Sequence, residues 1–467
     1  MTEKTRIFHH FFQENSSFFL WIVMVLSAYA KLWYVFYYTP YDQFLDGEMG
    51  LYWDKAVMSF YRGDFDASQW STLPPLGHIL LGWIFKIAYY FDLYLQKHEI
   101  ILGVNILLST LSVYLVYRIA LLLWDDGGYA LLSAMVYAFF FPLVYLDAFV
   151  LPDHPSQFAL LLSIWMLMEH SDEKLYVWIA GVILGVAIAI APVLIPSAMV
   201  LLLYVLFVPG VSRRRLIRGM VFIAGLGTLL LGVSVHNNTL SVGKLKTFSA
   251  NMGLEYYLNT CQRHTVRSLA AETPGTYASQ AINNPAAYGQ AVVPVPLTSE
   301  GYFLHQGTQC LRDTPFDLLL HLNNIKRLWG ENAYPNVHHS AAARHGLSIA
   351  SGIMKWMMAL LLLSPLLLYA PGIRHSAVLL LLGIAGAQWL GMILFGIEPR
   401  FALRIFFIMD ILGVLLLFSI IRIIRHHWWQ TLLYLFLVLG MGYAYHTAQK
   451  NMVEDTSTFY LERNSSQ

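Results

Sequence analysis

The stretch PLGHILLGWIFKIAYYFDL, residues 75–93, decides the topology of this chain. It is one of many apolar runs in a sequence that is 57% hydrophobic and 12% charged, with a mean hydropathy of +0.54. Soluble domains are about 25% charged. The composition therefore predicts a polytopic, all-α membrane protein. The apolar runs are residues 17–39, 75–93, 99–123, 128–147, 156–170, 175–192, 193–208, 217–236, 348–370, 376–396, 402–424 and 428–446.

The basic segments conflict with a topology in which all these runs cross the membrane. Positive charge favours the cytoplasmic side for the N-terminus, for GVSRRRLIRG (210–219) and for IRIIRHH (421–427). If every run spanned, residues 210–219 would lie outside. The run 75–93 follows Pro74-Pro75 and contains Lys86, so we interpret it as a juxtamembrane or re-entrant helix on the outer side. About eleven spans then remain, and both basic segments are cytoplasmic.

This topology predicts a transmembrane bundle with a small domain on its outer face. The first apolar run is expected to be a retained helix and not a cleaved signal. Irregular sequence collects outside, where function is expected in loops. The expected parts are a transmembrane module with outer loops 40–98 and 144–156 (1–236), an outer loop domain (237–347), C-terminal helices with an outer turn at 395–404 (348–446) and a polar tail (447–467).

Charged residues mark the ends of the predicted helices on the outer side. The stretch FLDGEMGLYWDKA (44–56) holds three carboxylates, and LPPLGH (73–78), VYLDAFVLPDHPSQF (144–158) and FGIEPRFALR (395–404) hold more charges and two histidines. Interface charges are often merely solvated; Asp64 and Asp66 fit that interpretation, and Asp147 fits either. Carboxylates can instead act as base or metal ligand, and arginine suits a phosphate. The candidates are Asp46, Glu48, His78, Asp153, His154, Glu398, Arg400 and Arg404.

In this order the motifs resemble the GT-C glycosyltransferase superfamily, in the branch of protein O-mannosyltransferases and the lipid A aminoarabinose transferase. DGEMGLYWDKA resembles the family's acidic motif with a spaced Tyr and Ala, here Tyr52 and Ala56. LPPLGHILLGWIF, FPLVYLDAFVLPDHPSQFALLL, LSVGKLKTFSANMGLEYYLN and EPRFALRIFFIMDILGVLLL resemble later motifs. The family's adjacent acids are split here by Gly47, and Leu73 replaces its histidine, with His78 lying after.

The resemblance implies an inverting transfer of sugar from a polyprenyl phosphate. Asp46 or Glu48 would be the base, and Asp153 would orient the acceptor or share a divalent cation, Mg²⁺ or Mn²⁺, with the first acid, with His154 as a further ligand. Arg400, helped by Arg404, would stabilise the departing phosphate. Tyr52, His78 and Glu398 are further candidates for substrate binding.

The resemblance and the composition also indicate the partners of the protein. The acceptor is expected to be a lipid, a glycan or a protein outside a bacterial inner membrane, and the net charge of +1 argues against nucleic acid. A disulfide between Cys261 and Cys310 is expected if this outer region faces an oxidising compartment. Residues 316–336 are expected to form an amphipathic helix. A flippase for lipid-linked sugars and a polysaccharide polymerase or ligase remain as alternative functions.

Overall fold

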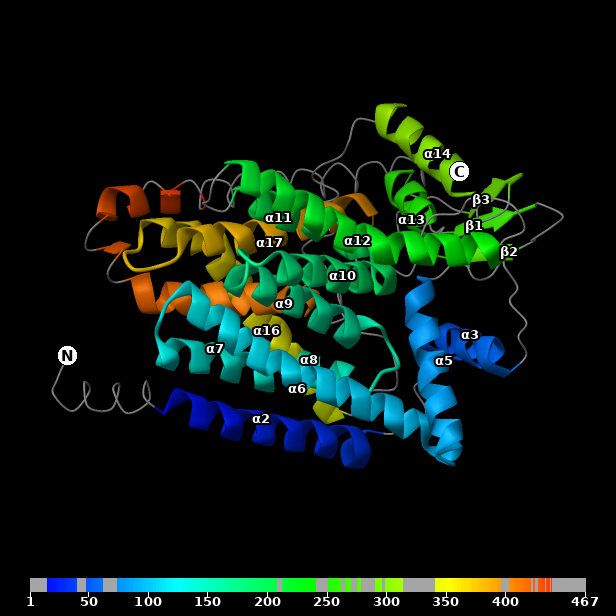
Figure 1. The fold of residues 1–467 in the computed structure, drawn as a ribbon, viewed down its shortest axis with the longest axis horizontal. Helices are drawn as coiled ribbons and strands as arrows, with labels where there is room; N and C mark the ends of the chain where they lie inside the picture. Colours follow the sequence, from blue (N-terminus) through cyan, green and yellow to red (C-terminus); the bar gives the residue numbers. More distant parts are fainter. Residues whose placement is uncertain are drawn as a thin grey trace, which may run out of the picture.

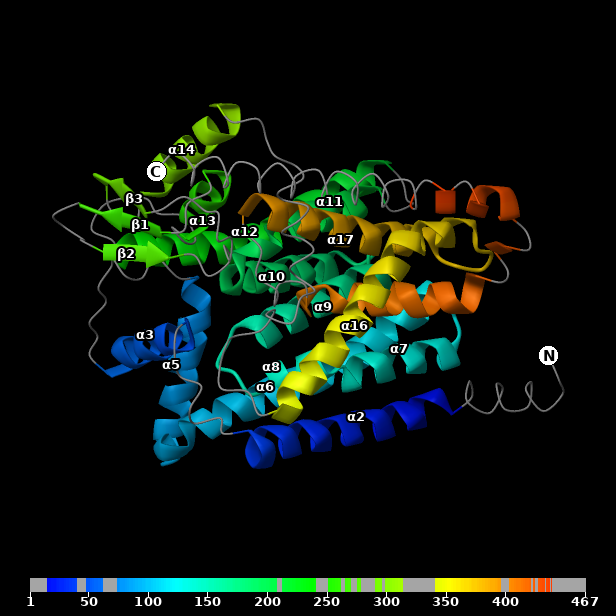
Figure 2. The same cartoon turned by 180° about the vertical axis from the view of Figure 1, so that it is seen from behind.

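The protein is a bundle of helices with a smaller domain at one end, as seen in a computed structural model (Figures 1 and 2). The structure describes residues 15–39, 48–61, 74–207, 212–240, 251–261, 265–269, 275–278, 290–295, 299–313, 341–395, 403–420, 423–424, 427–432, 434–436 and 438. The predicted helix 316–336 and the polar tail lie outside these residues.

The helices of the bundle follow the predicted apolar runs closely. They are α2 (Ser16–Trp33), α6 (Lys97–Leu123), α7 (Gly127–Phe139), α8 (Phe141–Leu146), α9 (Asp153–Glu169), α10 (Lys174–Ile190), α11 (Ile195–Phe207), α12 (Ser212–Leu240), α16 (Ala341–Leu363), α17 (His375–Phe395) and the helix Phe406–Ile420.

Within the described residues, four helices are long and apolar enough to cross a membrane. They span Ser16–Tyr38, Tyr94–Leu123, Arg215–Val235 and His345–Tyr369. Six further apolar helices are shorter. The fold is therefore that of a mainly helical, multi-pass membrane protein, and the count of about eleven spans remains a prediction.

The predicted run 128–147 is two helices and not one. Asp126 caps α7, since its side chain accepts hydrogen bonds from the backbone N–H groups of Gly128 and Tyr129 at 2.9 and 3.1 Å. Phe140 then adopts an extended backbone, and α8 starts with Pro142 in its first turn. Proline fits the start of a helix but not its interior, so the sequence favours a break here.

Close packing of α10 on α12 rests on glycine. A Cβ atom built on Gly181 would lie 2.5 Å from the carbonyl oxygen of Phe222, and a Cβ on Gly225 would meet the carbonyl oxygen of Trp178. Only glycine lets the two backbones approach this closely.

Cationic side chains meet acidic or carbonyl groups at one end of the bundle. Arg118 pairs with Glu169, Arg218 pairs with Asp172 at 2.6 Å, and Arg374 donates to the carbonyl of Met168 at 3.0 Å. These three arginines, of which Arg218 belongs to the predicted cytoplasmic segment 210–219, therefore lie at a common end. We call it the inner end, after the cytoplasmic side predicted for basic segments.

The loop elements gather at the other end, which we call the outer end (Figure 1). They include α3 (Glu48–Tyr61) and α5 (Pro75–Tyr90), and α5 runs across the direction of the bundle helices (Figure 1). A helix lying along a membrane surface would have this direction. Tyr52 of α3 packs on α5, where a Cβ on Gly77 would lie 2.9 Å from its ring.

The small domain at the outer end contains α13 (Asn251–Thr260), α14 (Glu300–Asp313) and a three-stranded sheet. Strand β1 (Thr265–Ser268) lies between β2 (Gly275–Ala278), which is antiparallel to it, and β3 (Gln290–Val293), which is parallel. This sheet is a feature that the all-α prediction did not include.

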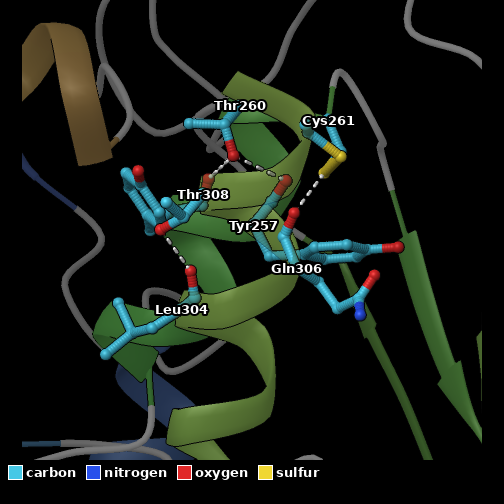
Figure 3. The surroundings of a disulfide bond; sticks show 8 residues. Tyr257, Thr260, Cys261, Leu304, Gln306 and Thr308 are labelled. Carbon is cyan, nitrogen blue, oxygen red and sulfur yellow. Dashed lines mark hydrogen bonds between the residues drawn. A yellow bond between two sulfur atoms is a disulfide. The ribbon is translucent and has the colours of Figure 1, made fainter. Parts of the chain in front are cut away.

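A disulfide joins Cys261, after α13, to Cys310 of α14, with the two Cα atoms 5.3 Å apart (Figure 3). Helices α13 and α14 and strand β3 form a separate apolar core of Leu254, Leu258, Val293 and Phe303. Both cysteines of the chain are thus used to fasten the small domain.

Candidate active site

Buried polar side chains collect near the outer end of the bundle, on segments far apart in the sequence. They come from α2, α6, the loop after α8, the start of α9 and the residues just before the helix Phe406–Ile420. The buried residues are Lys31, Asn105, Ser109, Asp147, Asp153, His154, Gln157 and Arg404.

Asp153 and Arg404 form an ion pair that joins the start of α9 to the residues just before the helix Phe406–Ile420. Arg404 Nε donates to Asp153 Oδ1 at 2.9 Å, and Nη2 lies 2.7 Å from the same oxygen. Each side chain is 5% exposed. A charge-assisted bond in a buried place is stronger than one in water, and losing one partner would leave the other charge uncompensated.

The sequence places Asp153 well for this role. Pro152 precedes α9 and Pro155 lies in its first turn, where proline is tolerated, so the helix starts at the acid. A carboxylate in the first turn is favoured by the helix dipole. The Oγ of Ser156 donates to the carbonyl of Asp153 at 2.9 Å, which further fixes the turn.

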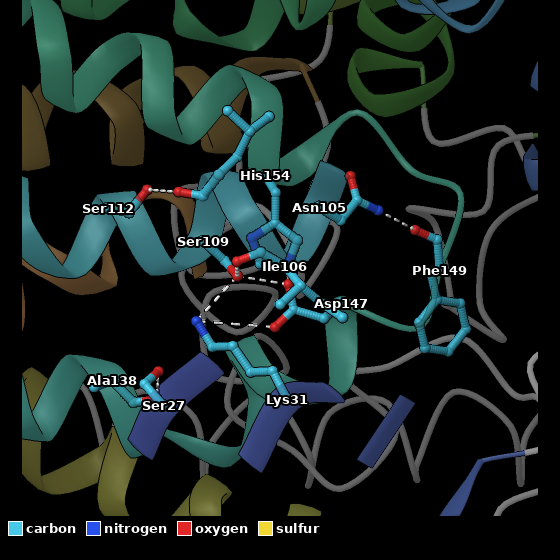
Figure 4. A network of polar contacts seen from close by, with 11 residues as sticks. Ser27, Lys31, Asn105, Ile106, Ser109, Ser112, Ala138, Asp147, Phe149 and His154 are labelled. Atoms are coloured by element: carbon cyan, nitrogen blue, oxygen red, sulfur yellow. Dashed lines mark hydrogen bonds and ion pairs between the residues drawn. The ribbon is translucent and has the colours of Figure 1, made fainter. Parts of the chain in front are cut away.

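A second network lies beside this pair and centres on Asp147 (Figure 4). Ser109 Oγ donates to Asp147 Oδ1 at 2.7 Å, and Lys31 Nζ donates to Ser109 Oγ at 3.0 Å. Lys31 Nζ also lies 3.9 Å from Asp147 Oδ2, and His154 Nε2 lies 3.2 Å from Asp147 Oδ1. We call these four residues, Lys31, Ser109, Asp147 and His154, the Asp147 network.

Two side-chain amides fix the backbone around the Asp153–Arg404 pair and the Asp147 network. Asn105 Nδ2 donates to the carbonyl of Phe149 at 2.9 Å, which ties the loop after α8 to α6. Gln157 Nε2 donates to the carbonyl of Leu403 at 3.0 Å, next to Arg404. The positions of the ionic groups are therefore set by neutral hydrogen bonds as well.

The first outer loop is described only in part. Glu48 is the first residue of α3, its side chain is outside the described atoms, and Asp46 lies outside the described residues. Tyr52 is buried at the contact between α3 and α5, and His78 of α5 is also buried. Glu398 and Arg400 also lie outside the described residues, so of the predicted outer-turn residues only Arg404 can be placed.

The proposed metal ligands separate in the part of the chain that the structure describes. Asp153 pairs with Arg404, and His154 faces Asp147. No group of three or more His, Cys, Asp and Glu side chains suited to a metal ion occurs among these residues. The arrangement of Asp153 and His154 therefore gives no support to a metal, and no step below depends on one.

The sequence alone assigned no role to Lys31, Asn105, Ser109 or Gln157. One signal was present for Lys31, because a lysine inside an apolar span normally has a partner inside the protein. The partner could not be read from the sequence, since Asp147 lies on another segment 116 positions away.

Comparison with known families gives one match. Residues 74–237 match the family model described as dolichyl-phosphate-mannose-protein mannosyltransferase, a GT-C type glycosyltransferase family. No curated protein matches the chain. The resemblance found in the sequence is thereby confirmed over this segment, which includes α5 to α12 and Asp153, and it supports a multi-pass membrane glycosyltransferase of the GT-C kind.

Proposed function

From this match over residues 74–237, we propose that the protein transfers a sugar from a polyprenyl-phosphate donor to an acceptor hydroxyl at the outer face of a bacterial inner membrane. The single observation that favours this function is the buried Asp153–Arg404 pair at the outer end. It combines a carboxylate inside the matched segment with a guanidinium, the side chain best suited to a phosphate.

The reaction needs two charges in fixed places. The acceptor oxygen attacks the anomeric carbon, a carboxylate takes the hydroxyl proton, and the bond from that carbon to the phosphate oxygen breaks with its electron pair going to the phosphate. Attack from the opposite face inverts the anomeric centre. The phosphate leaves as an anion, so it needs no acid and gains from nearby positive charge.

In this proposal Arg404 stabilises the leaving phosphate, with Arg400 as its neighbour, and Asp153 keeps the guanidinium in one orientation. A preoriented cation in a buried site loses little energy to reorganisation when charge develops. Asp46 or Glu48 is the base. The position of α3 supports this assignment of the base. Helix α3 begins at Glu48 and lies at the same end of the bundle as the start of α9 (Figure 1).

The test is transfer of radiolabelled sugar from a polyprenyl-phosphate donor to endogenous acceptors in membranes. We expect Asp46→Asn or Glu48→Gln, and Asp153→Asn, to reduce transfer by about a hundredfold or more. Asp54→Asn is the matched control, because Asp54 is an exposed acid on the same helix α3. Full transfer by all three site variants would refute the proposed site.

A flippase for lipid-linked sugars is the second candidate, and one observation favours it. Asp410 is fully buried in the helix Phe406–Ile420, and neither carboxylate oxygen has a hydrogen-bond partner among the described residues. Ionisable groups inside spans are typical of transport paths. Movement of labelled donor across vesicle membranes without any transfer product would favour this function over the first.

A further inference from the structure

The Asp147 network joins three segments that the proposed mechanism does not use. Lys31 comes from α2, Ser109 from α6 and Asp147 from the loop after α8, and His154 is the second residue of α9 (Figure 4). We propose that Lys31, Ser109 and Asp147 are positioning residues: through His154 they fix the first turn of α9 and so hold Asp153 and Arg404 in place for sugar transfer. This inference rests on the proposed function.

Lys31 and Asp147 are already paired inside the bundle. Lys31 contacts Ser109 and Asp147, and Asp147 accepts from Ser109. We therefore assign both residues a role that passes through their neighbours. Asp147 has one such neighbour on α9, since its Oδ1 lies 3.2 Å from His154 Nε2.

The path from Asp147 to the ion pair is short. His154 adjoins Asp153 in the first turn of α9, and Asp153 Oδ1 accepts two bonds from Arg404. A displacement of Asp147 would move His154 and the start of the helix with it. The start of α9 is also linked to the residues before the helix Phe406–Ile420 by Gln157, which donates to the carbonyl of Leu403.

The charges explain why both Lys31 and Asp147 are present. A buried carboxylate is costly unless it is paired and hydrogen-bonded, and Asp147 receives both from Lys31 and Ser109. Two apolar residues could fill the same space at less cost, but they would remove the carboxylate that His154 faces at 3.2 Å. The carboxylate oxygen that faces His154 is therefore the functional part, and Lys31 makes its charge tolerable.

Two double variants separate positioning from charge balance. Lys31→Met with Asp147→Asn removes both charges but keeps an oxygen that can accept from Ser109 and face His154. Lys31→Met with Asp147→Ala removes both charges and the acceptor. We expect the first to keep a kcat close to that of the wild type, and the second to lose about ten- to a hundredfold in kcat, as displaced catalytic groups do.

A matched control comes from a buried polar contact elsewhere in the bundle. Gln388 of α17 donates to Ser197 Oγ of α11 at 2.6 Å, and both residues are buried. Ser197→Ala is expected to lower the Tm while leaving kcat unchanged. It shows what loss of a buried hydrogen bond does when no link to Asp153 exists.

Hydrogen exchange gives a second readout that does not require activity. We expect the amides of residues 156–158 to exchange faster in the Lys31→Met, Asp147→Ala protein than in the Lys31→Met, Asp147→Asn protein. Equal kcat and equal exchange in the two double variants would overturn the positioning role. Absence of transfer by the wild type would overturn the proposed function instead, and the exchange comparison would still decide whether the network fixes α9.

Discussion

At the scale of single residues, the ion pair between Asp153 and Arg404 is the feature with the clearest consequences. The two residues are 251 positions apart, and both are nearly inaccessible to solvent. Bringing two charges out of water is costly, so the pair adds little net stability by itself. Its effect is to make each residue depend on the other.

Removal of the arginine should therefore be severe. We expect Arg404→Met to destabilise the fold by about 3–5 kcal/mol, because it leaves the Asp153 carboxylate buried without its cation. The measurement is the Tm in detergent, together with sugar transfer. Arg404→Lys should be intermediate in Tm, since lysine keeps the charge but lacks the planar fork of donors.

Adding Asp153→Asn to Arg404→Met provides the control for charge. The double variant should regain part of the lost Tm without regaining transfer. A Tm for Arg404→Met equal to that of the wild type would contradict the burial of the pair.

At this scale the sequence singled out some of the buried polar residues and left others without a role. Asp153, His154 and Arg404 were singled out because charged residues stood at predicted helix ends, and all three are buried at the outer end. Asp147 was left open between a solvated and a functional role, and it proves to be fully buried at the centre of a network. Its surroundings depend on α2 and α6, which no local pattern reveals.

At the scale of helices and strands, apolar runs predicted where helices form but not how they meet. The break between α7 and α8 at Phe140 was within a run that looked continuous. The direction of α5 across the bundle (Figure 1) is the one that a juxtamembrane helix would have. The sheet of four-residue strands in the small domain was missed, because strands this short leave little periodicity to detect.

The contact of α10 with α12 predicts different effects on stability for substitutions at two glycines of α12, Gly225 and Gly227. We expect Gly225→Ala to destabilise the protein by about 1–3 kcal/mol, since the new methyl group meets the carbonyl of Trp178. Gly227→Ala is the control, because a Cβ there has nothing within 4 Å. The Tm of the two variants should differ clearly. Equal values would show that the two helices do not pack as described.

At the scale of the whole molecule, charged and irregular parts divide between the two ends of the bundle. Arg118, Arg218 and Arg374 meet residues 168–172 at the inner end. The helices α3, α5, α13 and α14 and the small sheet lie toward the outer end (Figures 1 and 2). This division agrees with the positive-inside rule applied to the sequence.

Cysteine labelling tests the sidedness of the two ends. The chain has two cysteines and they are bonded to each other, so an added cysteine is the single free thiol. Leu95, before α6, is 84% exposed, and Lys174, at the start of α10, is also exposed. We expect an impermeant maleimide to label Leu95→Cys in intact cells, and Lys174→Cys only after permeabilisation. The reverse pattern would invert the topology.

The sequence by itself determined that the chain is a helical membrane protein, which end of its helices is basic, and that acids and an arginine stand at the opposite ends. These properties are local, since hydropathy and charge can be read residue by residue. Only the tertiary structure decided that Asp153 meets Arg404 and that Lys31 meets Asp147. The physical reason is that a buried charge must find a partner inside the protein, and helix packing decides which distant residue that partner is.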